Sequence, residues 1–279
     1  MFLLQLKSEL WKLFGKKRTY IGTGMFLLAQ AIVVLFLKYM KGPNREIARD
    51  LERSGFPVDH YLTNLTIATI TLIPIAGFLM PLYASLVGGD LVAKEAEDGT
   101  LRMVLSRPVS RLRLLLVKWG AGVLFSFGLV IALGLTGSLF TSLFYPTGGL
   151  FVALPPGIFG VFDGAAAWER FAAAHVAMTA EACTIMTLAF MFSCFNIKPA
   201  AATILAISFF FISFILDNLP YLADYREWFL VQHLYVWTNV FKSPVPWWRI
   251  GESLSILAGY NLTFLIVGCS VFQARDIKS

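Results

Sequence analysis

Charged residues are scarce in this chain: they make up 14% of its 279 residues, whereas hydrophobic residues make up 57%. A soluble domain carries roughly 25% charged residues. Segments of ~20 apolar residues, long enough to cross a bilayer core of roughly 30 Å, recur along the sequence. The composition therefore excludes an ordinary soluble protein and predicts a polytopic membrane protein. The net charge of +6 does not indicate a nucleic acid partner, because the basic residues flank the apolar segments.

Residues that carry metal or catalytic chemistry are also few. The cysteines all fall inside apolar segments without Cys-x-x-Cys or Cys/His spacing, which supports neither a disulfide framework nor a zinc site. The histidines are scattered, and no Ser/His or di-Asp arrangement accompanies them. These residues are Cys183, Cys194, Cys269, His60, His175 and His233. We therefore expect a non-catalytic membrane protein with no metal and no bound cofactor, rather than an intramembrane enzyme.

The chain also lacks the phosphate-binding loop Gly-x-x-x-x-Gly-Lys-Ser/Thr. Its polar segments are too short to hold a nucleotide-binding domain. The sequence therefore predicts that this chain has no nucleotide site of its own.

The apolar segments that are present predict six transmembrane helices in a single domain, residues 1–279, of all-α integral membrane fold. The expected spans are residues 19–38, 64–88, 114–142, 171–196, 200–217 and 252–272. The third exceeds one bilayer crossing, so it must tilt or protrude. Prolines are expected to kink the second span, and glycines allow close helix contacts in the third. These residues are Pro74, Pro81, Gly120, Gly122, Gly134 and Gly137.

The first 18 residues predict an amphipathic helix at the membrane surface. Its apolar face holds Phe2, Leu3, Leu6, Leu10, Leu13 and Phe14, and its polar face holds Gln5, Ser8, Glu9, Lys12 and Lys16. The run Lys16-Lys17-Arg18 would meet anionic lipid. The larger share of the Lys and Arg residues lies on the side of the N-terminus, which places both termini in the cytoplasm.

The segments expected on the opposite side are longer than simple turns. A short charged helix is predicted near residues 44–54, and the Gly- and Pro-rich stretch 145–168 is predicted to be re-entrant or to follow the membrane surface. Residues 218–251 form an aromatic-rich extracytoplasmic loop. Its aromatic residues are expected either to anchor the fold at the headgroups or to form an exit gate for an amphipathic substrate. They are Trp228, Phe229, Tyr235, Trp237, Phe241, Trp247 and Trp248.

Glu181 lies near the middle of the fourth predicted span. An ionisable side chain costs about 2.5–3.5 kcal/mol there and usually faces a bundle interior or a watery cavity. Two interpretations stay open: a structural or protonated interior acid, and a functional acid along a substrate path.

The polar stretch from Gly89 to Lys118 has unusually ordered local chemistry. Asp98 and Thr100 can cap a short helix, and the glycine between them permits a sharp turn. Pro108 disfavours helix at the residue before it, and Ser110 can cap the next helix. The pattern predicts a short helix across the cytoplasmic face, with acids before it and arginines after it, that contacts a second protein. A solvated connector is the alternative.

The same stretch resembles the signature region of the permeases of type-2 ABC exporters. The residues that carry the resemblance are Glu95-x-Glu97-Asp98-Gly99-Thr100-Leu101, then Leu105-Ser106-x-Pro108-Val109-Ser110-Arg111, and the ending Val271 to Ile277. Arg102 departs from the pattern, which often has an apolar or small residue there. The resemblance covers essentially the whole chain.

That resemblance implies a permease subunit that pairs with a second copy of itself and with two copies of a cytoplasmic ABC ATPase subunit. It implies that residues 89–113 are the coupling loop. The expected contact residues are Glu95, Glu97, Asp98, Gly99, Thr100, Leu101, Arg107, Pro108, Ser110 and Arg111. We expect the protein in the cytoplasmic (inner) membrane of a prokaryote, in contact with lipid. The alternative is an ATPase-coupled adaptor that assists assembly or signalling of extracytoplasmic proteins without moving a solute.

Overall fold

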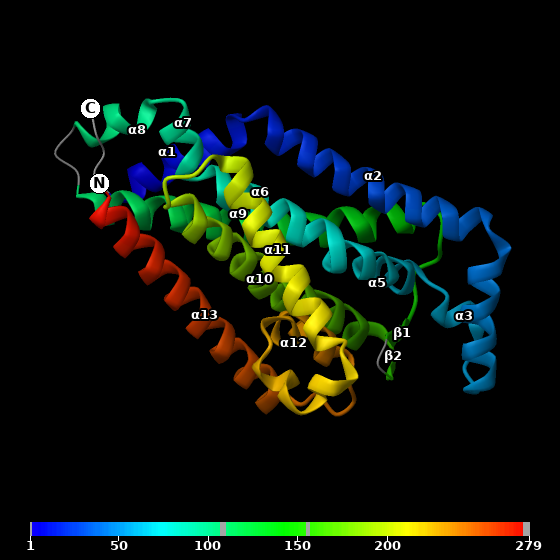
Figure 1. The fold of residues 1–279 in the computed structure, drawn as a ribbon. Helices are drawn as coiled ribbons and strands as arrows, with labels where there is room; N and C mark the ends of the chain where they lie inside the picture. The colour runs from blue at the N-terminus through cyan, green and yellow to red at the C-terminus, as the bar shows by residue number, and fades with distance from the viewer. Residues whose placement is uncertain (1, 107–109, 155–156, 276–279) are drawn as a thin grey trace.

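The computed structural model describes residues 2–106, 110–154 and 157–275 (Figure 1). Within these residues, six helices are long and apolar enough to cross a membrane. They are α2 (Lys17–Tyr39), the composite helix Asn64–Asp90, α9 (Arg111–Ser142), α10 (Gly164–Ser193), α11 (Pro199–Asp217) and α13 (Trp247–Ala274). Each coincides with a predicted span, and the prediction of an all-α integral membrane protein is confirmed.

The remaining elements lie at the two ends of the bundle. They are α1 (Phe2–Gly15), α3 (Lys41–Arg53), α4 (Val58–Tyr61), α7 (Ala93–Glu97), α8 (Thr100–Leu105), β1 (Leu150–Leu154), β2 (Ile158–Phe162), η2 (Pro220–Trp228), α12 (Leu230–Leu234) and η3 (Tyr235–Phe241). Figure 1 shows α1, α7, α8 and the end of α13 together at one end, and α3, α12 and the strands toward the other. The helix α3 contains the charged helix predicted near residues 44–54.

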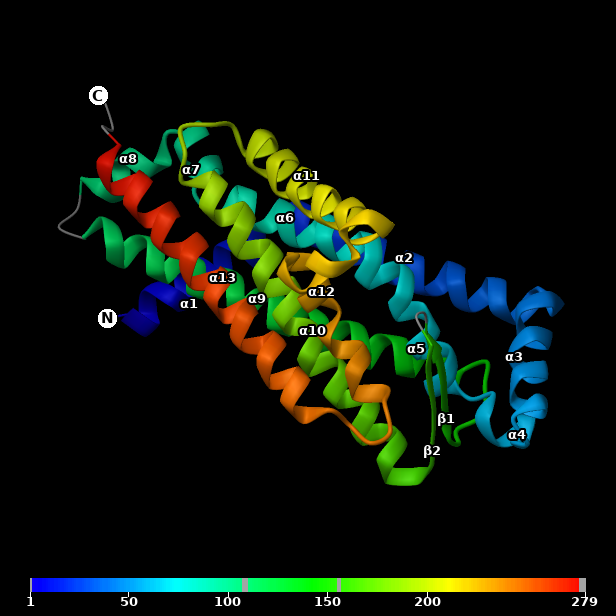
Figure 2. The same ribbon diagram turned by 60° about the horizontal axis from the view of Figure 1, so that its bottom comes forward.

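The central helix is α10, which packs against α6, α9 and α13 (Figure 2). In its most apolar 18-residue stretch, 67% of the α10 residues are buried, whereas the share is 22% in the corresponding stretches of α2 and α13. The helices α2 and α13 are therefore peripheral. The approach of α6 (Met80–Asp90) to α10 depends on Gly88, because a Cβ there would lie 2.1 Å from the Met186 carbonyl oxygen. Replacing this glycine would force the two helices apart.

Proline interrupts the second span, as predicted. The helix α5 (Asn64–Pro74) passes into a π-helical turn, η1 (Ile75–Leu79), before α6 begins. A proline lacks the backbone N–H that would continue the α-helical ladder, so the hydrogen-bond pattern changes here. Close glycine contacts in α9 are also confirmed: a Cβ at Gly122 would lie 2.7 Å from Met186 Sδ, and one at Gly134 would lie 2.7 Å from His175 Cδ2.

The stretch 145–168 contains an antiparallel β-hairpin, which the sequence did not predict. The strands β1 and β2 pair from Leu150↔Phe162 to Leu154↔Ile158. The hairpin is fastened to α5, because the Phe151 N–H donates to Thr66 Oγ1 over 2.9 Å. Short apolar runs of this kind fit a strand or a helix equally well by periodicity, so the apolar pattern alone does not predict the two strands.

The aromatic loop divides into two groups. Trp228, Trp247 and Trp248 are exposed, as interface anchors should be. Trp237 and Phe241 are instead buried in the core, so the prediction that these two side chains anchor the fold by contact with headgroups is wrong. The reason is that η3 packs against α10, so these side chains pack inside the helix bundle.

Candidate functional site

The connection between α6 and α9 folds into two short helices, α7 and α8. They meet at Gly99, whose φ of +73° is a left-handed conformation that glycine adopts at little cost. The predicted short helix is α8, which begins at Thr100. The predicted cap of the next helix is confirmed, because Ser110 Oγ accepts from the Arg113 N–H over 3.3 Å. Arg107 and Pro108 lie outside the described residues.

Four of the predicted contact residues are exposed: Glu97, Asp98, Gly99 and Ser110. Glu97 and Asp98 are exposed and stand at the α7–α8 turn, beside the exposed Gly99. Lys94 Nζ forms ion pairs with both carboxylates, at 2.8 Å from Glu97 Oε2 and 3.0 Å from Asp98 Oδ1. The nearby Met103 side chain is 64% exposed. These residues form an acidic outer surface with an apolar neighbour.

Three other predicted contact residues face the protein instead. Leu101 is 2% exposed and belongs to the hydrophobic core. Arg111 donates to the backbone carbonyls of Gln273 and Arg275, over 3.2 and 2.9 Å, and so joins α9 to the end of α13. Glu95 is turned toward α1 and α9. Local patterning could not separate these inward residues from the outward ones, because the partners come from distant segments.

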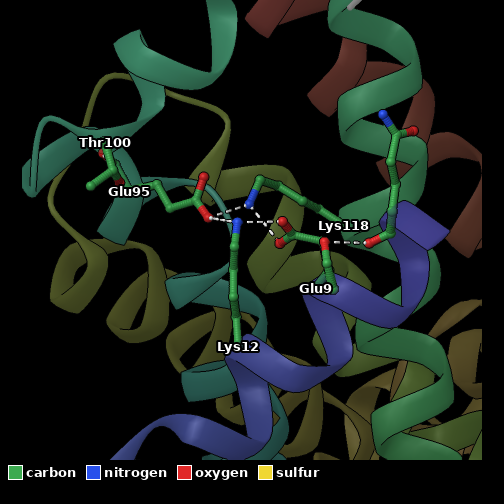
Figure 3. A network of polar contacts seen from close by, with 7 residues as sticks. Glu9, Lys12, Glu95, Thr100 and Lys118 are labelled. Atoms are coloured by element: carbon green, nitrogen blue, oxygen red, sulfur yellow. Dashed lines mark hydrogen bonds and ion pairs between the residues drawn. The ribbon is translucent and has the colours of Figure 1, made fainter.

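The Glu95 side chain belongs to a charge cluster with Glu9, Lys12 and Lys118 (Figure 3). Lys118 Nζ lies 2.7 Å from Glu95 Oε1 and 2.9 Å from Glu9 Oε2. Lys12 Nζ lies 2.6 Å from Glu9 Oε1 and 3.2 Å from Glu95 Oε1. Two acids and two lysines therefore neutralise each other across three elements, α1, α7 and α9. Lys118 is only 1% exposed, and a buried charge is tolerated when it is paired in this way.

The cluster also fixes the protonation of its members in α1. Burial opposes ionisation of Glu9, but the charges and hydrogen bonds of Lys118 and Lys12 outweigh it and hold the pKa of the carboxyl below its ordinary value. Burial likewise opposes the charge on Lys12, yet its contacts with Glu9 and Glu95 raise the pKa of the ammonium. Both groups are therefore charged at neutral pH.

Next to the cluster, the junction of α1 and α2 carries more charge. Arg18 Nη1 pairs with Asp90 Oδ2 over 3.1 Å, which ties the start of α2 to the end of α6. Arg113 Nε donates to Gln5 Oε1 over 3.0 Å. The polar face of α1 thus points into the protein at Gln5 and Glu9.

The predicted apolar face of α1 is consequently split. Leu6, Leu10 and Leu13 pack against the core, whereas Leu3 and Phe14 are exposed. The sequence indicated the amphipathic helix but missed the cluster. One signal was available: Lys118 falls inside the third predicted span, where an ionisable residue requires a partner.

Glu181 is fully buried in α10, as predicted for an interior acid. Neither carboxylate oxygen has a hydrogen-bond partner among the described residues. The Trp237 indole, from the η3 segment that packs on α10, is the polar group that faces this carboxyl, although its Nε1 does not meet full hydrogen-bond geometry with either oxygen. This region differs from the charge cluster because Glu181 forms no ion pair among the described residues, whereas Glu95 is paired through Oε1, although its Oε2 is also buried without a hydrogen-bond partner.

Comparison with known proteins identifies the family of the chain. Residues 8–225 match the family model described as ABC-2 family transporter protein. A similar protein is the uncharacterized protein YhcI of Bacillus subtilis (strain 168), which is 25% identical over 235 residues, or 81% of this chain and 71% of that protein. The family model spans well over half of the sequence, and the six helices that are long and apolar enough to cross a membrane are consistent with a membrane protein of that family. The chain therefore belongs to the ABC-2 transporter family.

Proposed function

We propose that this chain is the permease subunit of an ATP-driven exporter, and that the turn between α7 and α8 receives the movement of a separate ATPase subunit. Two copies of the chain would pair with two copies of that ATPase. The substrate crosses the membrane through the permease, while ATP and Mg²⁺ bind to the partner.

The observation that carries this proposal is the construction of the α7–α8 connection. It joins two membrane-spanning helices, α6 and α9, without a flexible linker between α6 and α7. Its outer side carries Glu97 and Asp98, and its inner side is held by Glu95 in the charge cluster. A force applied at the outer acids therefore reaches α9 through Lys118 and α1 through Lys12.

The sequence supports a partner as the source of energy, because the phosphate-binding loop is missing from it. The basic residues near α1, α7 and the start of α9 favour a cytoplasmic location for this end. In that orientation both termini are cytoplasmic, and α3 and the β-hairpin lie on the opposite side. An ATPase in the cytoplasm would then meet the acidic turn directly.

Purification of the tagged chain from native membranes tests the proposal. We expect an ATPase subunit to co-purify with the wild type. The double variant Glu97→Lys/Asp98→Lys should co-purify at least about ten-fold less ATPase than the wild type does, because like charges placed across an interface cost several kcal/mol. Glu95 is left unchanged, since reversing it would break the internal cluster instead.

A matched control carries the same charge reversal on α3, as Asp50→Lys/Glu52→Lys. Both of these side chains are exposed at the opposite end of the bundle. This control should retain the ATPase, and both variants should reach the membrane in equal amounts. Equal co-purification from the Glu97/Asp98 variant and the wild type would refute the assigned docking surface.

A further inference from the structure

We propose that Glu181 and the η3 segment that covers it form a proton-binding site, which holds a proton while η3 packs on α10 and releases it when η3 moves away. The segment follows α12 and contacts β2, toward the end of the bundle opposite α7 and α8 (Figure 1). The site needs no ATPase partner. Its test reads protonation alone, so it can fail or succeed independently of the proposed function.

The first observation is the burial of the acid. Glu181 is 0% exposed, and neither of its carboxyl oxygens has a hydrogen-bond partner among the described residues. An ionised carboxylate without a partner is so costly away from water that the group takes up a proton instead. No group of three or more metal-ligating side chains occurs in the described part of the chain. A proton requires only a carboxyl oxygen, so it is the cation that fits this site.

The second observation is the cover that η3 provides. The Trp237 indole faces the Glu181 carboxyl and is itself only 2% exposed. An indole N–H donates and cannot accept, so it cannot share the proton of a neutral carboxyl. Its Nε1 also lacks full hydrogen-bond geometry with either oxygen. Packing, rather than a strong polar bond, therefore keeps the acid covered.

The third observation is the uneven attachment of η3 to α10. The Val240 carbonyl, near the end of η3, accepts from Arg170 Nη1 over 2.8 Å. This bond fastens the last part of η3 to the first part of α10. Trp237 lies one turn earlier and has no comparable bond to α10 among the described residues. The part of η3 that covers Glu181 is therefore the part that can separate from α10.

The fourth observation is a series of polar groups that leads outward from Glu181. Burial raises the pKa of the Tyr235 phenol in η3, and negative charge on Glu181 or Asp217 raises it further, so Tyr235 is near both acids and keeps its own proton. Its hydroxyl lies beside the π-helical turn η1, where a Cβ at Gly77 would be 3.8 Å away. Such turns are frequent at functional sites. Asp217 ends α11, and its Oδ1 also has no hydrogen-bond partner in the described residues.

The other titratable groups around α10 are engaged elsewhere. The elements that pack against it, besides η3, are α5, α6, α9, α11, α12 and α13. Apart from exposed residues and Asp217, their titratable side chains are Tyr83 and Asp90, which contact Thr19 and Arg18; Arg111, Arg113 and Lys118, which contact Gln273, Gln5 and Glu9; His233 and Tyr260, which contact the Glu227 and Trp228 carbonyls; and Cys269, which is near Cys194. On α10 itself, His175 Nδ1 bonds to the Phe171 carbonyl, and Cys183 bonds to the Val123 carbonyl. The groups that bear on the charge of Glu181 are therefore Trp237, Tyr235 and Asp217.

The proton balance of the opening is simple. When η3 separates from α10, water reaches the carboxyl, and the proton passes from Glu181 to that water and on to the Asp217 carboxylate or to bulk solvent. Glu181 is left as a hydrated carboxylate, and no other bond changes. The closed arrangement binds one proton more than the open one, so a falling pH favours closure and a rising pH favours opening.

Infrared spectroscopy of the purified full chain in nanodiscs tests the site. An ordinary glutamate is ionised at about pH 7. We expect the wild type to show the carbonyl band of a neutral carboxylic acid at that pH, and we expect Glu181→Gln to lack it. Raising the pH should remove the band and give the midpoint of the titration.

A second variant tests the cover. Trp237→Leu lets water reach the carboxyl, so the midpoint should fall by at least about one pH unit, which is a ten-fold loss of proton affinity. The control Trp119→Leu removes an indole from α9 that contacts α10 by donating to Thr187 Oγ1 over 3.0 Å. This control should keep the midpoint of the wild type.

Transfer into D₂O tests the route, because exchange of the Glu181 proton for deuterium shifts the band. Asp217→Asn should slow this exchange. The control Asp224→Asn, at an exposed position on η2, should not.

Three results would overturn the proposal. The first is a wild type without a Glu181-dependent band at about pH 7, a result that requires no change at Trp237 if that variant fails to fold. The second is a midpoint that Trp237→Leu leaves unchanged or that Trp119→Leu lowers equally. The third is the same exchange rate in the Asp217 variant as in the wild type, which would contradict the outward route.

Discussion

The charge cluster and the surroundings of Glu181 solve the same physical problem in opposite ways. In the cluster, Lys118 is almost fully buried and makes two ion pairs, to Glu9 and Glu95. Glu181 is fully buried and neither of its oxygens has a partner in the described residues. A paired charge holds its elements together, whereas an unsatisfied acid costs free energy in the state that buries it.

This difference predicts which of the two regions is rigid and which can change conformation. Separating α1, α7 and α9 would expose or isolate four charges, so these elements should move as one body. Opening the contact between α10 and η3 would instead let water reach Glu181 and the Trp237 indole. We therefore expect rigidity at the end that carries α7 and α8, where we propose that the ATPase docks, and conformational change around Glu181.

The largest effect is expected from Lys118→Met, which leaves Glu9 and Glu95 facing each other with one cation fewer. Breaking a buried pair by removing one partner costs about 3–5 kcal/mol. The free energy of unfolding in mixed micelles should fall by that amount. Adding Glu9→Gln restores neutrality, so the double variant should recover part of the loss; simple additivity of the two losses would contradict the cluster.

A change of opposite sign is expected from Glu181→Met. The substitution removes a buried, unsatisfied carboxyl at similar volume, so the free energy of unfolding should rise by about 1–3 kcal/mol. If Glu181 serves transport, ATPase stimulation by substrate should fall at the same time. Glu169→Met, at an exposed position on the same helix, should stay within about 0.5 kcal/mol. Strong destabilisation of the Glu181→Met variant would contradict this expectation. It would show that Glu181 makes a stabilising hydrogen bond, for which the Trp237 indole is the donor that faces it.

A smaller effect is expected from Ser110→Ala, which removes the cap of α9. Loss of an N-cap typically costs about 1 kcal/mol. Because Lys118 lies two turns farther along α9, fraying at Ser110 should also weaken the cluster. Ser106→Ala, which changes a similarly exposed serine before the helix, serves as the control. Equal melting temperatures for the two variants would argue against the cap.

The smallest effect is expected from pH. Because the pKa of Glu9 lies below 4.5, its contribution is present above that pH and is lost only as the pH falls through the lowered value. The pKa of Lys12 lies above 10.5, so its contribution is present below that pH and is lost as the pH rises further. The stability difference between the wild type and Glu9→Gln should therefore be constant from about pH 5.5 to 9.5. A slope within that window would show that the cluster is not fully charged.

The sequence predicted those parts of the fold that depend on local pattern. Apolar length predicted the six spans, Pro74 predicted the interruption of the second, and Ser110 predicted the start of α9. The start of the helix at Thr100 followed from the glycine before it, whereas the Thr100 hydroxyl donates to the Glu95 carbonyl and the predicted capping bonds stay a prediction. These signals work because they rest on neighbouring residues and on the thickness of the bilayer.

What the sequence could not predict depends on contacts between distant segments. The inward turn of Glu95 requires Lys118, and the burial of Trp237 requires the packing of η3 on α10. The split face of α1 has the same origin, since Leu6 and Glu9 meet α9 while Leu3 does not. The docking role of Glu97 and Asp98 stays a prediction.

The length of α9 has a mechanical consequence. Its 32 residues give a rod of about 48 Å, well beyond the roughly 30 Å hydrocarbon core. The charge cluster grips this rod at Lys118, about 11 Å from its first residue and about 36 Å from its last. Because the cluster joins α1 and α7 to α9 at this point, a tilt of the joined body about Lys118 moves Ser142 about three times as far as Arg111. A shift of about 1 Å at Arg111 would thus accompany one of about 3 Å at Ser142, which is comparable to the helix shifts seen in switching proteins.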